Sequence, residues 1–134
     1  MKHTARKRFG QNFLNDDNII ARIVDVINPQ ADDNMIEIGP GQAALTKLLL
    51  KQLKQLDVIE IDRDLVKKLE PLREQYPGFV IHSANALKFD FRSLQKSADK
   101  KLRIIGNLPY NISTPLLFHL LKQSDVIHDM HFML

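Results

Sequence analysis

The chain has 134 residues, 44% of them apolar, which is enough for one ordinary domain with a buried core. It contains no cysteine, which excludes a disulfide framework and a thiolate metal site. No stretch approaches the ~20 apolar residues of a membrane-spanning helix. The basic N-terminus is not followed by the apolar run of a secretory signal. We therefore predict a cytoplasmic protein with no membrane segment.

The excess positive charge lies in the first eight residues. The chain carries 19 Lys and Arg against 16 Asp and Glu, a net charge of +3. Lys2, Arg6, Lys7 and Arg8 all precede the first acid, Asp16, so the rest of the chain is slightly acidic. Such arms commonly bind phosphates by releasing counterions, although charge alone fits a solvated, frayed terminus equally well. Arg6, Lys7 and Arg8 are candidate RNA-binding residues.

Helix and strand patterns alternate from residue 16 onward. Asp16 or Asp17 can cap a first helix, whose inward face is apolar: Ile19, Ile20, Ile23, Val24 and Ile27. A strand is predicted at 35–38, and leucines line one face of the helix that follows: Leu45, Leu48, Leu49 and Leu53. A second strand is predicted at 58–61.

The second half of the chain continues this order. Asp64 can cap a helix that Pro71 is expected to kink or end. Another helix is predicted to open at Thr114, with Pro115 in its first turn. Three further strands are predicted, at 79–81, 102–105 and 130–134.

The predicted strands are unbroken apolar runs, as expected of strands buried on both faces of a sheet. Their alternation with helices indicates right-handed βαβ units. We predict an α/β fold with a mainly parallel sheet and helices on both faces. Because the run at 130–134 would leave the fifth strand truncated, we expect the chain to be the N-terminal piece of a longer protein.

Ligands of open α/β sheets bind at the carboxyl ends of the strands. Gly39 and Gly41 follow the first strand and would let the backbone pass close to a ligand. Glu60 lies about 20 residues further on, at the end of the second strand, where an acid can hold both hydroxyls of a ribose. These positions predict an adenosine-containing cofactor.

Two cofactors fit the glycine turn. Gly39, Gly41 and Ala44 satisfy the relaxed dinucleotide pattern G-x-G-x-x-G/A, which is compatible with NAD. However, Pro40 removes a backbone N–H that a pyrophosphate would use, and Glu37 adds negative charge suited to a cationic sulfonium. We therefore favour S-adenosylmethionine. A tight turn that binds no ligand remains the alternative for the glycines alone.

The fourth strand ends in Asn107-Leu108-Pro109-Tyr110, a sequence suited to holding a base. The Asn107 side-chain oxygen and the Leu108 carbonyl can accept hydrogen bonds from an adenine amine, and Pro109 restricts Leu108 to extended angles. Tyr110 can stack on a flipped base. Catalysis would then rest on positioning, with the cofactor supplying the methyl group. Alternatively, Asn107 caps backbone groups and Tyr110 packs in the core.

Four segments carry a family resemblance: RKRFGQNFL at 6–14, EIGPG at 37–41, EID at 60–62 and NLPYNIS at 107–113. Together they closely resemble the ribosomal RNA adenine N6,N6-dimethyltransferases, in particular the bacterial small-subunit group. The resemblance spans nearly the whole chain and implies a Rossmann-like class I methyltransferase fold. It implies methyl transfer from S-adenosylmethionine to two adjacent adenosines near the 3′ end of 16S rRNA, within the assembling small subunit.

The resemblance also implies roles for single residues. Asn107, Leu108, Pro109 and Tyr110 match the target-base motif. The matching cofactor-binding positions are Asn12, Leu14, Gly39, Gly41, Glu60, Asn85 and Asn107. Asn85 stands where the family usually has Asp, so we expect weaker cofactor affinity rather than loss of activity.

The resemblance divides the chain at residue 15. Residues 1–15 would form a basic, cofactor-contacting arm, and residues 16–134 the N-terminal part of the methyltransferase domain. The rest of the sheet and a small helical domain would follow, in a protein that is monomeric when full length.

Three other functions remain open at this stage. They are a large-subunit rRNA methyltransferase of the macrolide-resistance type, a non-catalytic rRNA-binding assembly factor and an NAD oxidoreductase. His128 and His131 lack further ligands for a metal site, so no metal is predicted. Phe89 and Phe91 are expected to pack in the core, and we assign no role to His82.

Overall fold

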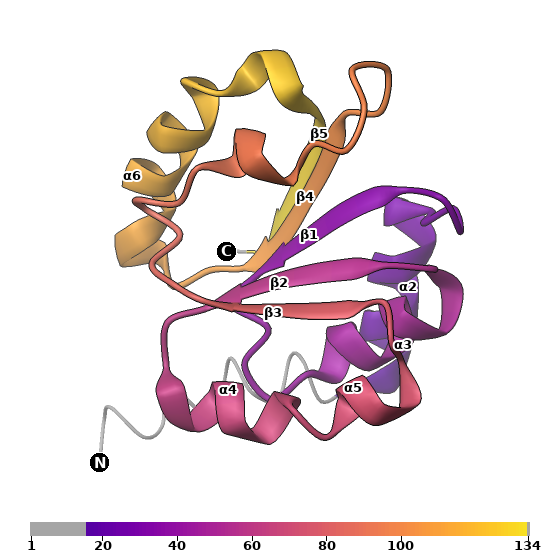
Figure 1. Cartoon of the computed structure of the whole chain (residues 1–134). Helices are drawn as coiled ribbons and strands as arrows, with labels where there is room; N and C mark the ends of the chain where they lie inside the picture. The colour runs from indigo at the N-terminus through magenta and orange to yellow at the C-terminus, as the bar shows by residue number, and fades with distance from the viewer. Residues whose placement is uncertain (1–15, 134) are drawn as a thin grey trace.

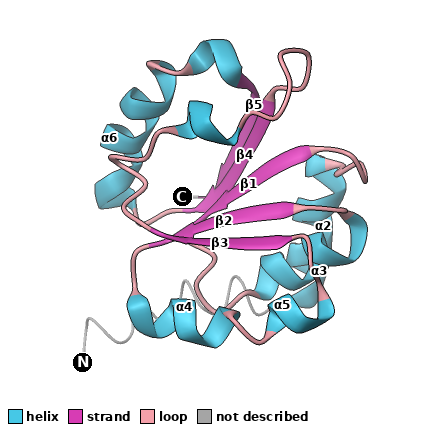
Figure 2. Cartoon of the chain, in the orientation of Figure 1, coloured by secondary structure: helices cyan, strands magenta, loops and turns pink. Residues whose placement is uncertain are grey.

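The computed structural model describes residues 16–133, and within them five strands form one sheet. The strands are β1 (Asn34–Ile38), β2 (Leu56–Glu60), β3 (Phe79–Ser83), β4 (Leu102–Asn107) and β5 (Ile127–Met133). Their order across the sheet is β3-β2-β1-β4-β5, and every neighbouring pair is parallel (Figures 1 and 2). The predicted parallel α/β sheet is confirmed.

Helices cover both faces of this sheet. They are α2 (Asp17–Ile27), α3 (Ala44–Gln52), α4 (Arg63–Leu69), α5 (Leu72–Gln75) and α6 (Tyr110–Leu121), with 3₁₀ turns η1 (Phe91–Leu94) and η2 (Ser124–Val126). The helices α2 to α5 lie on one side, and η1 and α6 lie on the other (Figure 1). Across residues 16–133, no helix has both the length and the apolar character needed to cross a membrane.

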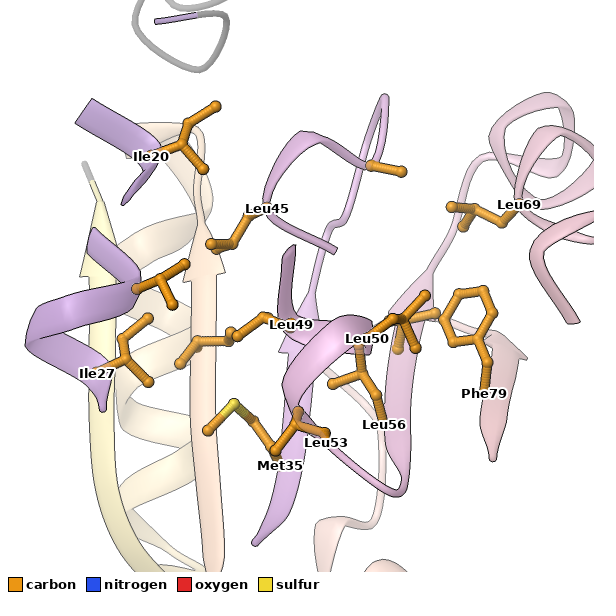
Figure 3. Packing of buried hydrophobic residues seen from close by; sticks show 14 residues of the cluster. Ile20, Ile27, Met35, Leu45, Leu49, Leu50, Leu53, Leu56, Leu69 and Phe79 are labelled. Carbon is orange, nitrogen blue, oxygen red and sulfur yellow. The ribbon is translucent and has the colours of Figure 1, made fainter. Parts of the chain in front are cut away.

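Each face of the sheet contributes to a separate apolar layer, because side chains alternate along the central strands. Figure 3 shows the first layer, where residues of α2, α3 and α4 pack with residues of β1, β2 and β3: Ile20, Ile27, Met35, Leu45, Leu49, Leu50, Leu53, Leu56, Leu69 and Phe79. The second layer joins α6 and η1 to the opposite face: Ile36, Ile38, Ile59, Phe91, Ile104, Leu116 and Leu120. Phe91 is fully buried, as predicted, and contacts Phe89 edge to face.

The helix boundaries confirm some predicted caps and correct others. Asp16 caps α2 by accepting from the backbone N–H of Asn18 at 3.0 Å. The cap of α4 is Asp62 rather than the predicted Asp64, because Asp62 has extended backbone angles and accepts from the N–H of Asp64 at 2.8 Å. Pro71 separates α4 from α5, as expected.

The prediction for the start of α6 was wrong. The helix begins at Tyr110 instead of Thr114, and Pro115 lies inside it. The preceding Pro109 has a φ of −58°, and its carbonyl accepts from Ile112 N–H at 3.1 Å, which forms the first turn earlier. Pro115 therefore removes one N–H from the helix interior without ending the helix.

Strand β5 is longer than predicted and pairs along the whole of β4, from Leu102 to Asn107. The expected start at residue 130 missed its polar N-terminal part. Asp129 belongs to the strand because its carboxylate accepts from Arg103 of β4, with Nε–Oδ1 at 3.0 Å. The same guanidinium bonds Asp33 at 2.7 Å and the carbonyl of Asn28 at 3.2 Å, and so links the end of α2 and the residue before β1 to β4 and β5.

Candidate active site

The glycine turn after β1 is shaped by three residues with positive φ. Gly39 has a φ of +67° and Gly41 of +57°, a region that side chains with a Cβ rarely adopt. Ala43 also has a positive φ, of 72°, which the sequence pattern did not predict. Its N–H donates to the Pro40 carbonyl at 2.9 Å and places α3 directly after the turn. The turn therefore depends on glycine for its conformation.

The acid at the end of β2 is bound to this turn. Glu60 is 6% exposed, and its Oε1 accepts from the Gly41 N–H at 3.2 Å. Its Oε2 accepts from the Asp62 N–H at 3.0 Å. The carboxylate thus has a fixed orientation, and each oxygen retains a lone pair for a hydroxyl donor. This geometry suits a ribose.

A second acid, Glu37, lies deeper below the turn. It is 3% exposed, and Thr46 Oγ1 of α3 donates to its Oε1 at 2.5 Å. Burial raises the pKa of Glu37 to about 7, the Thr46 hydrogen bond opposes this rise, and the charge of Glu60 adds to it. The Thr46 contact could not be found from the sequence, since no pattern links the two residues.

The loop after β3 brings Asn85 toward the same strand ends. The Ala84 N–H donates to the Glu60 carbonyl at 3.1 Å, which anchors this loop to β2. Asn85 is half-buried, and its Oδ1 accepts from the Leu87 N–H at 3.0 Å. A carboxamide oxygen has two lone pairs, so the loop bond leaves it able to accept from an adenine amine.

The Asn-Leu-Pro-Tyr segment bridges β4 and α6. Asn107 ends β4, and a Cβ added at Gly39 would lie 3.8 Å from the Asn107 carbonyl, so the two strand ends are adjacent. Leu108 is buried, and its N–H donates to the Met133 carbonyl at 3.0 Å. Tyr110 is 73% exposed. The alternative in which Tyr110 packs in the core is therefore wrong.

The Asn107 side chain is half-buried and forms no hydrogen bond within residues 16–133. In this part of the chain it does not cap the backbone. No side chain or backbone group of residues 16–133 competes with a ligand for this carboxamide, which lies beside an exposed tyrosine ring.

The structure brings together the predicted residues that follow β1, β2, β3 and β4. The predicted N-terminal contacts lie outside the described residues: Arg6, Lys7, Arg8, Asn12 and Leu14. A hollow of about 450 Å³ opens beside the turn, and its wall contains Gly41, Lys47 and Lys68. Residues of α4 and α5 also line it, and no residue of the Asn107 segment does.

A second polar pair, which is partly buried, was also missed by sequence reasoning. His82 lies within β3, and its Nε2 is 2.8 Å from Oδ2 of Asp57, which is 4% exposed. The ring of His82 also packs edge to face on Phe89. Asp57 of β2 pairs with Val80 of β3, and His82 lies two residues after Val80. Side chains two residues apart on a strand lie on the same face, so the strand pairing could have suggested this contact.

The family model described as "Ribosomal RNA adenine dimethylase" matches residues 2–134. A relative from Nitrosomonas europaea, "Ribosomal RNA small subunit methyltransferase A", is 60% identical over 135 residues, covering 100% of this chain and 50% of its own. A relative of the same name from Marinobacter nauticus is 58% identical, covering 98% of this chain and 47% of its own. The chain thus spans about half the length of these relatives.

Two solved structures share the fold. A dimethyladenosine transferase from Plasmodium falciparum aligns with a TM-score of 0.69 at 28% identity, covering 86% of this chain and 41% of its own. The 23S rRNA methyltransferase ErmE aligns with a TM-score of 0.70 at 25% identity, covering 84% of this chain and 44% of its own. The fold is that of Rossmann-like class I methyltransferases, and the chain belongs to the ribosomal RNA adenine dimethylase family.

Proposed function

We propose that the chain supplies the cofactor and adenine sites of an S-adenosylmethionine-dependent enzyme that dimethylates N6 of two adjacent adenosines near the 3′ end of 16S rRNA. The observation that carries this proposal is the Asn107 carboxamide, which forms no hydrogen bond with the described residues and lies beside the exposed Tyr110 and the glycine turn. Membership of the family and the names of the relatives support the substrate.

The cofactor site fits S-adenosylmethionine better than a dinucleotide. Glu60, oriented by the Gly41 N–H, can accept from both ribose hydroxyls. Glu37 and Glu60 bring two carboxyl groups to the site, which suits a positive sulfonium and opposes a pyrophosphate. Asn12, Leu14 and Asn85 would complete the contacts. When bound, the cofactor supplies an electrophilic methyl group.

The target base would be held by the segment after β4. Asn107 Oδ1 and the Leu108 carbonyl would accept from the two N–H groups of the adenine amine and orient its nitrogen toward the methyl group. Tyr110 offers an exposed ring on which a flipped base can stack. An adenine amine needs positioning more than deprotonation, so no strong base is required.

The partner would be 16S rRNA in the assembling small subunit, approached in the cytoplasm by a monomeric full-length protein. Arg6, Lys7 and Arg8 would contact RNA phosphates, which makes binding dependent on salt. The large-subunit alternative has less support, because ErmE is 25% identical whereas the small-subunit relatives reach 60%. A non-catalytic assembly factor would not require the free Asn107 carboxamide.

The test uses a chimera in which residues 1–134 replace the matching half of the Nitrosomonas europaea relative. We expect it to dimethylate adenosines near the 3′ end of 16S rRNA in small subunits that lack these methyl groups, detected by mass spectrometry of rRNA fragments. The Asn107→Ala chimera is the matched control and should be inactive. Methylation of 23S rRNA instead, or equal activity of the control, would overturn the proposal.

A further inference from the structure

A buried carboxyl group lies at the centre of the sheet, below the glycine turn. Glu37 pairs in register with Val58 of β2 and Ile105 of β4, and both of these neighbours are 0% exposed. Glu37 itself is 3% exposed. An ionised carboxylate in such surroundings is costly unless an opposite charge compensates it.

Among residues 16–133, one side-chain hydrogen-bond donor and one charged side chain act on Glu37. Thr46 Oγ1 donates to Oε1 at 2.5 Å, and Glu60 of β2 contributes a negative charge. The other α2 and α3 side chains that pack on this layer are apolar: Ile20, Val24, Ile27, Leu45, Leu49 and Leu50. Within residues 16–133 Glu37 forms no salt bridge. These surroundings stabilise the protonated form of Glu37 relative to an exposed carboxyl group, and an approaching cation would oppose that effect.

The pair is attached to both ends of the glycine turn. Glu37 lies two residues before Gly39, and Thr46 lies on the first turn of α3, which follows Ala43. Glu60, whose charge reaches Glu37, is itself bonded to the turn at Gly41. A ligand seated on the turn would therefore be in electrostatic contact with Glu37.

We propose that Glu37 and Thr46 form a charge-sensing pair that makes the site hold S-adenosylmethionine more tightly than its product, S-adenosylhomocysteine. This inference rests on the proposed function, in which S-adenosylmethionine is the methyl donor. The donor and its product differ by one methyl group and one positive charge. Glu37 loses its proton to solvent when the sulfonium form binds, and the carboxylate keeps the Thr46 hydrogen bond. After methyl transfer the bound product is a neutral thioether, so Glu37 would take a proton back from solvent, which favours product release.

The proposal predicts a pH dependence for the ratio of two affinities. Because the pKa of Glu37 is about 7, its ionised fraction rises about tenfold between about pH 6 and about pH 8. The affinity for S-adenosylmethionine relative to S-adenosylhomocysteine should rise with it, approaching about tenfold. The ratio cancels the amino and carboxyl groups that both ligands carry. The ratio likewise cancels the titration of any protein group that affects the affinities for the two ligands equally.

Calorimetric titration of the 134-residue chain with each ligand measures this ratio across that pH range. Glu37→Gln should make the ratio independent of pH. Thr46→Val removes a hydrogen bond that favours the ionised carboxyl, so the midpoint should move to higher pH. Thr46→Ser keeps the hydroxyl and should restore the original midpoint. Circular dichroism checks that each variant is folded.

A second measurement follows Glu37 directly, through the carboxyl carbon signal of the labelled side chain in NMR. Its pKa should be lower in the chain saturated with S-adenosylmethionine than in the chain saturated with S-adenosylhomocysteine. Equal values, or a wild-type affinity ratio that does not change with pH, would overturn this inference and leave the proposed function intact. A folded chain that binds neither ligand would overturn both.

Discussion

The free energy of unfolding should depend strongly on the side chain of Arg103. Its guanidinium bonds Asp129 of β5, Asp33 before β1 and the carbonyls of Ile27 and Asn28 at the end of α2. The Arg103 side chain is 13% exposed, against 15% for Asp33 and 31% for Asp129. Replacing Arg103 with Met keeps the aliphatic volume and removes the guanidinium donors, while Asp33 still accepts from the Gln30 N–H and Asp129 still contacts His131.

The cost follows from this geometry. Removing one partner of a buried pair costs about 3–5 kcal/mol, and the partial exposure of Asp129 reduces this to about 2–4 kcal/mol for Arg103→Met. For a domain of this size the melting temperature should fall by roughly 10 °C. Urea unfolding followed by circular dichroism measures the change in the free energy of unfolding.

The matched control is Arg92→Met. Arg92 also donates to an aspartate, because two of its guanidinium nitrogens contact the two carboxylate oxygens of Asp125. However, the side chains of Arg92 and Asp125 are 45% and 64% exposed. Water screens and competes with such a pair, so we expect a much smaller change in the unfolding midpoint. Equal effects of the two substitutions would refute the reasoning that burial and the α2 carbonyls make the Arg103 contacts stabilising.

The Arg103 effect should also depend on pH. Burial raises the pKa of Asp129, but the hydrogen bonds and charges of Arg103 and His131 together outweigh burial and hold the pKa below its ordinary value. A lowered carboxyl pKa contributes stability above the unfolded value of about 3.9, and this is lost as pH falls through the folded value. The difference between wild type and Arg103→Met should be full near neutral pH and should shrink below about pH 4.

Four further predictions concern the site. Asn107→Ala should abolish methylation by the chimera while largely sparing S-adenosylmethionine binding in calorimetry, whereas wild-type turnover would contradict base orientation by this amide. Glu60→Ala should weaken cofactor binding by roughly 10- to 100-fold, because two charge-assisted hydrogen bonds are lost; an unchanged Kd would mean that the ribose is held elsewhere. Gly106→Ala should destabilise the fold by about 1–3 kcal/mol in urea unfolding, because the added Cβ would lie 2.8 Å from the Ile38 carbonyl oxygen. Wild-type stability would show that β1 and β4 can move apart at this position without cost. The pKa of Glu37 is raised from 4.5 to about 7, so the folded state binds this proton more tightly than the unfolded state. The free energy of unfolding should therefore decrease as the pH rises through this range, by on the order of 3 kcal/mol. Glu37→Gln should remove that slope, and an unchanged slope would assign it to another group.

The sheet could be predicted because its central strands β1, β2 and β4 are largely buried on both faces and are mostly apolar. Met35 and Ile36 belong to opposite apolar layers, so neither face of β1 needs polar residues. The same logic failed for β5, where Asp129 is compatible with the sheet only because Arg103 of the neighbouring strand binds it. Contacts between strands cannot be read from one strand's pattern.

The site was predictable where it depends on backbone and topology. Gly39 and Gly41 have the positive φ that their residue type suggests, and Glu60 lies beside them because the ends of parallel strands meet at one edge. The Glu37–Thr46 contact was not predictable, since it depends on how α3 packs over β1. The positive φ of Ala43 likewise follows from the turn that precedes it and has no sequence signal.

The most direct test of the central claim is calorimetric titration of the folded 134-residue chain with S-adenosylmethionine and, separately, with NAD. The arrangement of Gly41, Glu60 and Glu37 predicts that S-adenosylmethionine binds and that NAD neither binds nor competes with it. Binding of NAD, or binding of neither ligand by a chain shown to be folded, would contradict the assignment of these strand ends as a methyl-donor site.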